Sequence, residues 1–597
     1  MRIEKLIALK TAEAICKLYN TEVAVDLIAV KETVTLYKET GDFTIVVFPF
    51  VKISKKSPDI TANEIGPYLL QEIAEIQSFS VIKGFLNLKI KDIYWISFLN
   101  STDFNQYGFP TKRSNQKILV EYSSPNTNKP LHLGHIRNNL LGSSVAEILK
   151  ANGNYVIQLN LINNRGIHIC KSMLAWIKWG NGETPENTGL KGDQLVGKYY
   201  VLFDKHYKEE VKELTAKGIS EEDASKKAPL ILEAQEMLRK WEKNDPDILS
   251  LWNKMNQWVY TGFDETYRRL GIKFDQIQYE SDTYLLGKQI VEKGVSENKL
   301  IKKEDGSVWA DLTQEGLDEK LLLRADGTSV YMTQDIGTAQ LRYDEHSPDK
   351  IVYVVGNEQN YHFDVLKRVL QKLGKNWADC IYHLSYGMVE LPEGKMKSRE
   401  GNVVDADDLI TGMEKIAAQT TTELGKTSGM EEKEAEILFH QIGLGALKYF
   451  ILKVDPKKNM MFNPNESIDF NGNTGPFIQY THARIRSVLR KASETGIVWE
   501  NKQIPYQNLL EKEKETIKLL YSYPAIIKEA GDILSPAIIA NYVYEVVKVF
   551  NSFYQDTPIL KNEDENTTQF RLLLSENTSM VIKSAMKLLG IDVPEKM

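Results

Sequence analysis

Apolar residues are spaced in different ways along the chain, and the first stretch, residues 1–110, mixes helical and strand-like spacing. A helical stripe starts at Ile3, and a second helical segment lies at 62–76. Strand-like runs lie at 43–51 and 81–90. Residues 101–116 are rich in Asn, Gly, Pro, Thr and charge, which is typical of a linker. We therefore predict a small N-terminal α+β domain over residues 1–110.

From Lys117 onward, short apolar runs alternate with helical stripes, which is the order expected of a doubly wound parallel sheet. The predicted strands lie at 118–122, 155–162 and 350–355. The predicted helices lie at 136–149, 167–179 and 362–373. We predict a multidomain α/β protein whose Rossmann-type core covers residues 115–404.

Two insertions interrupt the α/β pattern, and a helical region follows it. Residues 180–270 are rich in Glu and Lys with helical spacing, which predicts a helical insertion. Asp305 with Gly306 and Asp326 with Gly327 form turns between strand-like arms, which predict a β-type insertion at about 277–329. Helical stripes recur from 405 to 597 and predict an all-α C-terminal domain.

Composition and charge narrow the class of protein. With 42% hydrophobic and 26% charged residues, the chain resembles a soluble protein with large cores. Its formal net charge of −7 means that nucleic acid would have to be held by local basic patches. The three cysteines form no C-x-x-C pair, no apolar run reaches the roughly 18 residues of a membrane span, and the N-terminus lacks a secretory signal. We expect a cytoplasmic protein with no membrane partner.

The strongest candidate for chemistry is the turn at 125–135, which joins a predicted strand to a predicted helix. Such a turn presents backbone N–H groups and a positive helix end to a phosphate. His132 and His135 stand there with Gly134 between them, and no third metal ligand lies nearby, so no metal site is predicted. The two histidines could instead only cap the helix. Their place between strand and helix favours an ATP site for nucleotidyl transfer.

The second candidate is the basic loop at 394–401. Lys395, Lys397 and Arg399 put three cations between two glycines, which suits a mobile clamp on the β- and γ-phosphates of ATP. Taken alone, such a stretch is more often a solvated charged loop. Its position after the histidine turn, in the same predicted core, favours the phosphate clamp.

Together the two motifs resemble the HIGH and KMSKS motifs of class I aminoacyl-tRNA synthetases, and the surrounding sequence is similar to arginyl-tRNA synthetases. The matching stretches lie at 121–135, 331–339, 472–484 and 594–597. The resemblance implies an arginine–tRNA ligase that activates L-arginine with ATP to arginyl-adenylate, releases pyrophosphate and transfers arginine to the 3′-terminal ribose of tRNA(Arg). It also implies Mg²⁺ on the ATP phosphates, and we expect a monomer.

The resemblance assigns the ATP site to both motifs and to the segment after the strand at 350–355. The implied ATP contacts are Asn126, Lys129, His132, Gly134, His135, Gly356, Glu358, His362, Met396 and Ser398. The implied catalytic set is Lys129, His132, His135, Lys395 and Lys397. Ser398 stands where the KMSKS pattern has its second lysine, and the resemblance implies that Lys129 compensates.

A pocket for arginine must surround a planar guanidinium, which has five donors, with carboxylates and amide oxygens. The resemblance implies that Glu121, Ser123, Asn126, Tyr331, Asp335 and Gln359 form this pocket. Tyr331 and Asp335 are four residues apart, so they share a face if that segment is helical. Without the resemblance, each acidic residue would be interpreted as a solvated side chain.

For tRNA, the resemblance implies contacts with the outer corner by Phe85 and Asn87, and with the anticodon by Tyr480, Arg484 and Met597. Aromatic and arginine side chains at helical spacing can stack on and pair with splayed bases. The plain alternative is an aromatic core stripe with a solvated basic face.

Three other functions fit parts of the pattern. A synthetase for another amino acid would keep both ATP motifs but would need a pocket different from Glu121, Asp335 and Gln359. A nucleotidyltransferase for a small molecule would need neither the long helical C-terminus nor the N-terminal domain. A non-catalytic RNA-binding module would not need both phosphate motifs.

Overall fold

The computed structural model describes residues 2–33, 41–392, 404–427, 429–499, 503–562 and 564–597. These residues form two compact units, and each is described by itself. Unit 1 comprises Met1–Asn105, Leu489–Tyr521 and Val549–Thr578. Unit 2 comprises Gln106–Val488, Ser522–Lys548 and Ser579–Met597.

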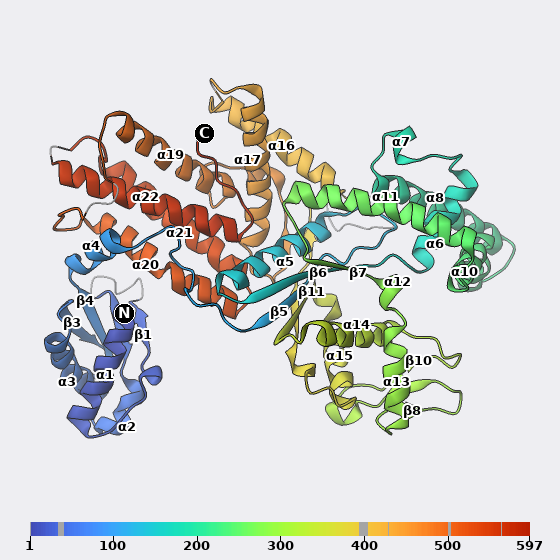
Figure 1. Ribbon diagram of the computed structural model, residues 1–597, viewed down its shortest axis with the longest axis horizontal. Coiled ribbons are helices and arrows are strands. Elements are labelled where there is room, and N and C mark those ends of the chain that lie inside the picture. Colours follow the sequence, from blue (N-terminus) through green and yellow to red (C-terminus); the bar gives the residue numbers. More distant parts are fainter. Residues whose placement is uncertain (1, 34–40, 393–403, 428, 500–502, 563) are drawn as a thin grey trace. The chain divides into compact units, whose positions relative to one another are not determined.

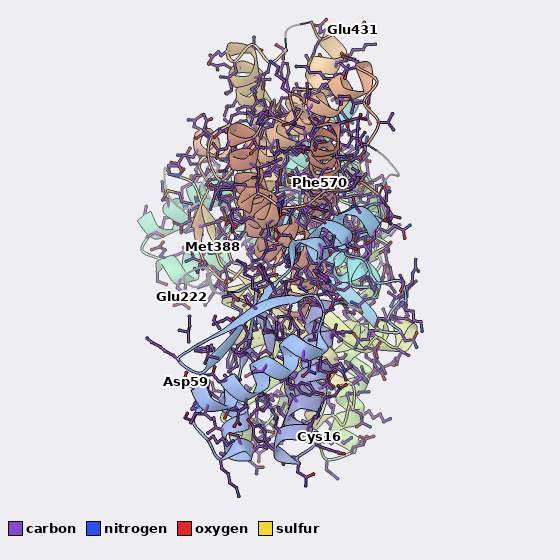
Figure 2. All side chains as sticks on the ribbon, turned by 90° about the vertical axis from the view of Figure 1, so that its left-hand side faces the viewer. Cys16, Asp59, Glu222, Met388, Glu431 and Phe570 are labelled. Atoms are coloured by element: carbon purple, nitrogen blue, oxygen red, sulfur yellow. The ribbon has the colours of Figure 1, made fainter. Side chains whose placement is uncertain are left out.

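Unit 1 contains a four-stranded antiparallel sheet with the strand order β1-β2-β4-β3. Its strands are β1 (Val30–Glu32), β2 (Phe43–Val46), β3 (Ile76–Ile82) and β4 (Phe85–Ile90). Its first helices are α1 (Ile3–Tyr19), α2 (Val51–Ser54), α3 (Pro58–Glu72) and α4 (Asp92–Ser101), with 3₁₀ turns η1 (Val25–Leu27) and η3 (Phe48–Phe50). Asp59 of α3, which is labelled in Figure 2, accepts a hydrogen bond from the N–H of Gly84 at 2.9 Å, and this bond fixes the helix to the β3–β4 turn.

Two strand predictions in this unit were wrong in extent. The run at 43–51 is a strand only to Val46, because Pro49 has no N–H to give to a ladder and a 3₁₀ turn replaces it. The run at 81–90 is not one strand, since β3 and β4 form a hairpin that turns at Lys83 and Gly84 with φ of 50° and 76°. Glycine tolerates the left-handed conformation that this turn requires.

Unit 2 contains a five-stranded parallel sheet with the order β12-β11-β5-β6-β7, which confirms the predicted doubly wound sheet (Figure 1). Its strands are β5 (Lys117–Glu121), β6 (Tyr155–Ile162), β7 (Gln276–Tyr279), β11 (Lys350–Gly356) and β12 (Ile381–Tyr386). This is the Rossmann order, with the topological switch point between β5 and β11. Ligands of such sheets bind outside the carboxyl ends of the strands at the switch point.

The helices that alternate with these strands include α5 (Leu133–Ala151), α6 (Ile167–Trp179), α14 (Tyr331–His346) and α15 (Asn360–Lys372), with 3₁₀ turns η5 (Asn357–Gln359) and η6 (Ala378–Cys380). The helices predicted at 136–149, 167–179 and 362–373 are confirmed. Gly142 lets α5 lie directly on Tyr122, because a Cβ at this position would overlap the tyrosine side chain. The start of α5 is thereby held at the end of β5.

Two insertions follow the predicted pattern in part. The helical one comprises α7 (Pro185–Thr188), α8 (Gly192–Ala216), α9 (Glu221–Lys227), α10 (Pro229–Glu242) and α11 (Pro246–Leu270). After it come α12 (Glu280–Thr283), α13 (Leu286–Ser296), the 3₁₀ turn η4 (Thr313–Glu315) and a small antiparallel sheet of β8 (Ile301–Lys302), β9 (Val308–Ala310) and β10 (Lys320–Leu323). The strand-like arm expected after Gly327 was wrong. A single bridge joins Leu323 to Ser329, and α14 begins at Tyr331.

The region after residue 404 is helical, as predicted, apart from the two-residue strand β14 (Met460–Met461), which pairs with β13 (Val389–Glu390). Its helices are α16 (Ala406–Glu423), α17 (Glu432–Leu452), α18 (Pro464–Ser467), α19 (Gly475–Glu494), α20 (Glu511–Asp532), α21 (Pro536–Asp556) and α22 (Glu565–Leu588). Within the described ranges, α17 alone is long and apolar enough to cross a membrane, and 61% of its most apolar window is buried inside the protein. Burial of that kind is usual for a core helix.

Candidate active site

The chain leaves β5 through a strained turn that two asparagines hold in place. Ser123 and Ser124 have φ of 77° and 45°, a left-handed conformation that residues other than glycine rarely adopt. The side chain of Asn138, on α5, accepts from the Ser123 N–H at 2.5 Å, and that of Asn160, on β6, accepts from the Ser124 N–H at 3.1 Å. The turn at the switch point is therefore fixed by its neighbours, as strained turns at functional sites require.

The two histidines cap the start of α5 reciprocally. His132 is the N-cap, and its Nδ1 accepts from the Gly134 N–H at 3.1 Å. The Nδ1 of His135 accepts from the His132 N–H at 3.2 Å, and the two ring centroids are 4.0 Å apart. The alternative considered from the sequence, that the two histidines cap the helix, is therefore seen in the structure. It occupies one nitrogen of each ring and leaves both Nε2 atoms for another partner.

The electrostatic environment keeps both rings neutral at pH 7. Burial lowers the pKa of His132 to about 4, and the positive charge of Lys129 adds to the effect. Burial also lowers the pKa of His135 well below its usual range, with His132 and Lys129 contributing. A neutral imidazole that accepts at Nδ1 carries its proton on Nε2. Each ring therefore offers an N–H donor at the positive end of α5, which is the arrangement that an anionic phosphate needs.

A cavity of about 560 Å³, here called the histidine cavity, opens beside this turn. It is lined by Lys129, Pro130, Leu131, His132, Leu190, Gln194, Gly197, Lys198, Tyr200, Val201 and Asp405. Burial lowers the pKa of Lys129, so this cation is held partly out of solvent near the histidines. The sequence predicted that Lys129 and His132 act together, and the structure brings them to one cavity.

A second cavity, of about 530 Å³ and here called the acidic cavity after its carboxylates Glu242 and Glu280, includes Asn126 and Tyr331 from the predicted arginine pocket. Its other lining residues come mainly from the ends of β6 and β7 and from α12 to α14: Asn163, Arg165, Gly166, Ile167, His168, Ile169, Leu238, Glu242, Glu280, Tyr284, Leu285, Lys288, Arg324, Gly327, Thr328, Ser329, Val330 and Gln334. Tyr331 is 73% exposed, so its ring is free to cover a ligand.

Tyr331 and Asp335 lie one turn apart at the start of α14, which confirms that they share a helical face. The carboxylate of Asp335 bonds the Nε2 of His362, from α15, at 2.6 Å. The predicted arginine ligand and the predicted ATP ligand thus contact each other. Both side chains are partly exposed, at 39% and 24%, so each can still meet a ligand.

The remaining predicted residues of this half of the site lie at the carboxyl end of β11. Gly356 is the last residue of the strand, and Glu358 and Gln359 follow in η5. Both side chains belong to exposed residues. They stand at the switch point, where a nucleotide or an amino acid would meet them, and their roles stay predictions.

Glu121 and Ser123 are buried within the frame of the site. One carboxylate oxygen of Glu121 accepts from Arg342, and the other accepts from the Ser124 hydroxyl at 3.0 Å. The Nε of Arg342 donates to Gln278 of β7 at 2.9 Å, and the Ser123 and Tyr267 hydroxyls are 2.7 Å apart. Glu121 therefore already holds a guanidinium, that of Arg342. Any contact that it makes with substrate must use its remaining acceptor capacity.

Sequence reasoning missed Glu280, the first residue after β7, whose side chain lines the acidic cavity. Burial raises its pKa to about 7, against the opposing effect of Arg165 and with a contribution from the charge of Asp335. A half-buried carboxylate facing a cavity is a strong candidate for a cation ligand. The available signal was a carboxylate directly after a parallel strand, but the four-residue β7 was too short to be recognised.

Arg165, which lines the same cavity, was also missed. Its guanidinium lies over the ring of Tyr284 at 3.9 Å and pairs with Glu242 at 3.1 Å. Stacking and pairing fix its position, so it shapes the wall of the acidic cavity.

Other predicted residues lie apart from both cavities or outside the described ranges. Lys395, Met396, Lys397 and Ser398 belong to the segment 393–403, which the structure does not describe. Tyr480 lies under the cations of Lys426 and Arg484, at 3.1 and 4.7 Å from its ring centroid, and its hydrogen bond with Arg484 lowers its pKa.

The predicted tRNA contacts in unit 1 differ in exposure. Phe85 is 39% exposed and packs edge-on against Phe48 with ring centroids 5.4 Å apart. Asn87 is only 3% exposed, and its side chain accepts from the Thr44 hydroxyl at 2.7 Å. Phe85 is thus presented to solvent, whereas Asn87 lies inside the sheet. Their roles, and that of the partly exposed Met597, stay predictions.

Comparison with known proteins gives consistent matches over the whole chain. Residues 100–463 match the family model "tRNA synthetases class I (R), catalytic domain", and residues 478–597 match the "DALR anticodon binding domain". An arginine–tRNA ligase from Phocaeicola vulgatus is 57% identical and one from Porphyromonas gingivalis is 54% identical, with 100% and 98% of each chain covered. The arginyl-tRNA synthetase structures from Thermus thermophilus (TM-score 0.78, 21% identity, 100% of both chains) and Plasmodium falciparum (TM-score 0.77, 20% identity, 100% of this chain and 99% of that chain) share the fold.

Proposed function

The chain belongs to the arginyl-tRNA synthetases of class I, and from this membership we propose which of its residues carry each part of the reaction. The protein is an arginine–tRNA ligase. It activates L-arginine with ATP to arginyl-adenylate, releasing pyrophosphate, and then transfers arginine to the 3′-terminal ribose of tRNA(Arg). Neither step needs a nucleophile from the protein, so its side chains act by positioning the reactants and stabilising charge.

The histidine turn binds the phosphates of ATP. The Nε2–H groups of His132 and His135 donate to the phosphate oxygens, and Lys129 supplies a positive charge beside them. Negative charge that develops as the arginine carboxylate attacks the α-phosphate meets fixed donors in a partly dry site, where they are most effective. Because both imidazoles are neutral, they donate without adding two positive charges to a buried cluster.

The acidic cavity takes the arginine side chain. Glu280 and Asp335 pair with the guanidinium, Tyr331 covers its aliphatic stem and Asn126 orients the backbone end of the amino acid. The observation that carries this proposal is Glu280, a half-buried carboxylate in this cavity. The negative charge of Asp335 contributes to the raised pKa of Glu280. Lysine is shorter and cannot form two parallel bonds, so carboxylates left unpaired discriminate against it.

Further parts of the proposal concern ATP-associated Mg²⁺, tRNA and location. Mg²⁺ enters with ATP, bound to its phosphates. Residues 1–110 bind the outer corner of tRNA through the exposed Phe85, and the buried Asn87 holds the sheet that carries it. The helical region 405–597 binds the anticodon through Tyr480, Arg484 and Met597. The core at 115–404 carries the chemistry. The protein acts as a cytoplasmic monomer.

The test is arginine-dependent exchange of pyrophosphate into ATP by the full-length protein, with and without tRNA(Arg). We expect exchange with arginine in the presence of tRNA(Arg), and charging of that tRNA with labelled arginine. Lysine and glutamate serve as control substrates. Exchange that depends on one of these instead of arginine would refute the assignment of the pocket.

A further inference from the structure

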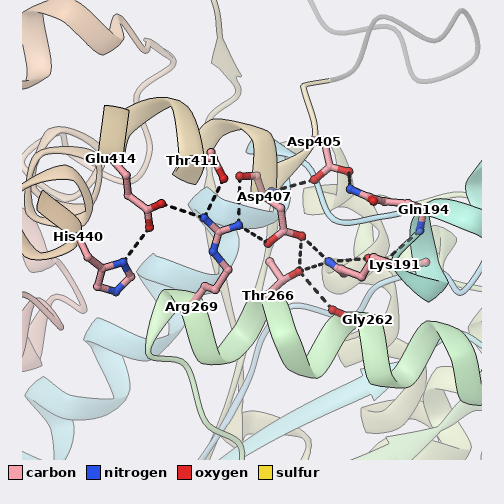
Figure 3. Close-up of polar contacts among 11 residues, drawn as sticks. Lys191, Gln194, Gly262, Thr266, Arg269, Asp405, Asp407, Thr411, Glu414 and His440 are labelled. Atoms are coloured by element: carbon pink, nitrogen blue, oxygen red, sulfur yellow. Dashed lines mark hydrogen bonds and ion pairs between the residues drawn. The ribbon is translucent and has the colours of Figure 1, made fainter. Parts of the chain in front are cut away.

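The start of α16 is the centre of a polar network that joins three segments far apart in sequence (Figure 3). The carboxylate of Asp407 accepts from Lys191, just before α8, and from the hydroxyl of Thr266, on α11, at 2.8 Å. It also accepts from the guanidinium of Arg269, on α11, at 3.1 Å. The outer end of the network runs from Arg269 to Glu414 at 3.3 Å.

Asp407 is the residue on which this network depends. Its side chain is only 11% exposed, yet it faces two cations and a hydroxyl group. Removing one charged partner from a partly buried cluster leaves the remaining charges without a partner, and this lowers the stability of the folded protein. The helices α8 and α11 approach each other closely here. Gly262 of α11 permits this approach, since a Cβ at this position would overlap the carboxylate of Asp193 on α8.

The network continues from Asp407 to the histidine turn through the main chain. Asp405 caps α16 by accepting from the Asp407 N–H at 2.8 Å, and the Ala406 N–H donates to the carbonyl of Leu131 at 2.9 Å. His132 and Asp405 form an isolated antiparallel bridge. The backbone that presents His132 is therefore attached to Asp405 and Ala406, and Asp407 fixes that segment to α11.

We propose that Asp407 is a positioning residue for nucleotidyl transfer, which holds the backbone of Leu131 and His132 through the start of α16. It contacts no reactant, and this inference rests on the proposed role of the histidine turn in ATP binding. Lys191 and Thr266 are its principal supports. Because the histidine donors are needed most in the transition state, a small displacement of this segment lowers the rate more than it weakens substrate binding.

The test compares Asp407→Asn with Glu414→Gln in the full-length protein, by ATP–pyrophosphate exchange in the presence of tRNA(Arg). Both changes turn a carboxylate that contacts Arg269 into its amide, but only Asp407 is bonded through its N–H to Asp405, the residue that bridges His132. We expect Asp407→Asn to lower kcat about 10- to 100-fold with the KM for arginine within about two-fold. Glu414→Gln should keep kcat within about two-fold of wild type.

Thr266→Val is a second test variant. It keeps the shape of the side chain and removes the hydroxyl group that contacts both Asp407 and Lys191. It should lower kcat by an intermediate factor, and it decides the test if Asp407→Asn does not fold, as judged by circular dichroism and thermal unfolding. Wild-type kcat in Asp407→Asn, or in Thr266→Val if only that variant folds, would overturn the inference. An equal loss in Glu414→Gln, or a change mainly in the KM for arginine, would also overturn it. Failure of the wild-type protein to show arginine-dependent exchange would instead reject the proposed function.

Discussion

We expect Glu280 to make the binding of arginine depend on pH between 6 and 8. Its pKa is raised to about 7, chiefly by burial, whereas its proposed partner, a guanidinium, binds the ionised carboxylate. The ionised fraction is about 0.9 at pH 8 and about 0.1 at pH 6, and apparent affinity scales with the competent fraction. The Kd for arginine should therefore rise roughly tenfold as the pH falls from 8 to 6.

The direction of this change in Kd follows from the proton that Glu280 must lose before it can pair with arginine. Lowering the pH adds a proton to Glu280 in the empty pocket, and arginine must displace it, so acid weakens binding and alkali restores it. Near pH 7, roughly half a proton should be released for each arginine bound. Replacing Glu280 with glutamine should weaken binding at pH 8 about 10- to 100-fold and remove the dependence on pH, since hydrogen bonds to charged groups contribute about 1.5–3 kcal/mol.

Isothermal titration calorimetry of full-length protein at pH 6, 7 and 8, in buffers of different ionisation enthalpy, measures both the Kd and the proton release. His168 lines the same cavity, so His168→Gln, which alters the cavity without removing a carboxylate, is the matched control. It should keep the tenfold dependence. Equal Kd values at pH 6 and pH 8 in wild type, or an unchanged slope in Glu280→Gln, would refute the role given to Glu280.

Three further predictions concern the frame of the site. Asp335→Asn should raise the KM for arginine about 10- to 100-fold in exchange assays and leave the KM for ATP within about two-fold, and a larger effect on ATP would contradict the assignment. Arg342→Leu leaves Glu121 buried without its partner and should destabilise unit 2 by about 3–5 kcal/mol in urea unfolding, with part of the loss recovered by adding Glu121→Leu. Gly142→Ala forces α5 away from Tyr122 and should cost about 1–3 kcal/mol by the same measurement; an unchanged midpoint would show that the contact is dispensable.

The strands and helices of the α/β core could be predicted because each has a single strong period. The predicted run 155–162 coincides with β6, and the helix at 167–179 coincides with α6. Predictions failed where a local turn overrode an apolar run. Pro49 ended β2 early, and Lys83 with Gly84 divided one expected strand into a hairpin.

The parts of the candidate site whose residues lie close together in the sequence could be predicted. The histidine turn lies within eleven residues, and Tyr331 and Asp335 lie on one helical turn, so spacing alone relates them. Glu280 and Asp407 could not be found in this way, because their importance arises from what the fold brings to them. Burial determines the pKa of Glu280, and residues more than 130 positions away surround Asp407.

Arg342 places inside the protein the same chemical group that the acidic cavity is proposed to select from solution. With Glu121 bound to this internal guanidinium and Glu280 about half protonated at pH 7, the empty site carries much less negative charge than its acidic residues suggest. A cluster of bare carboxylates would attract calcium or potassium from the solvent and would have to release the ion before each turnover. Arg165, Lys288 and Arg324 line the same cavity and add positive charge to it. We therefore expect inorganic cations to compete less for the place of the amino acid here than at a cluster of bare carboxylates.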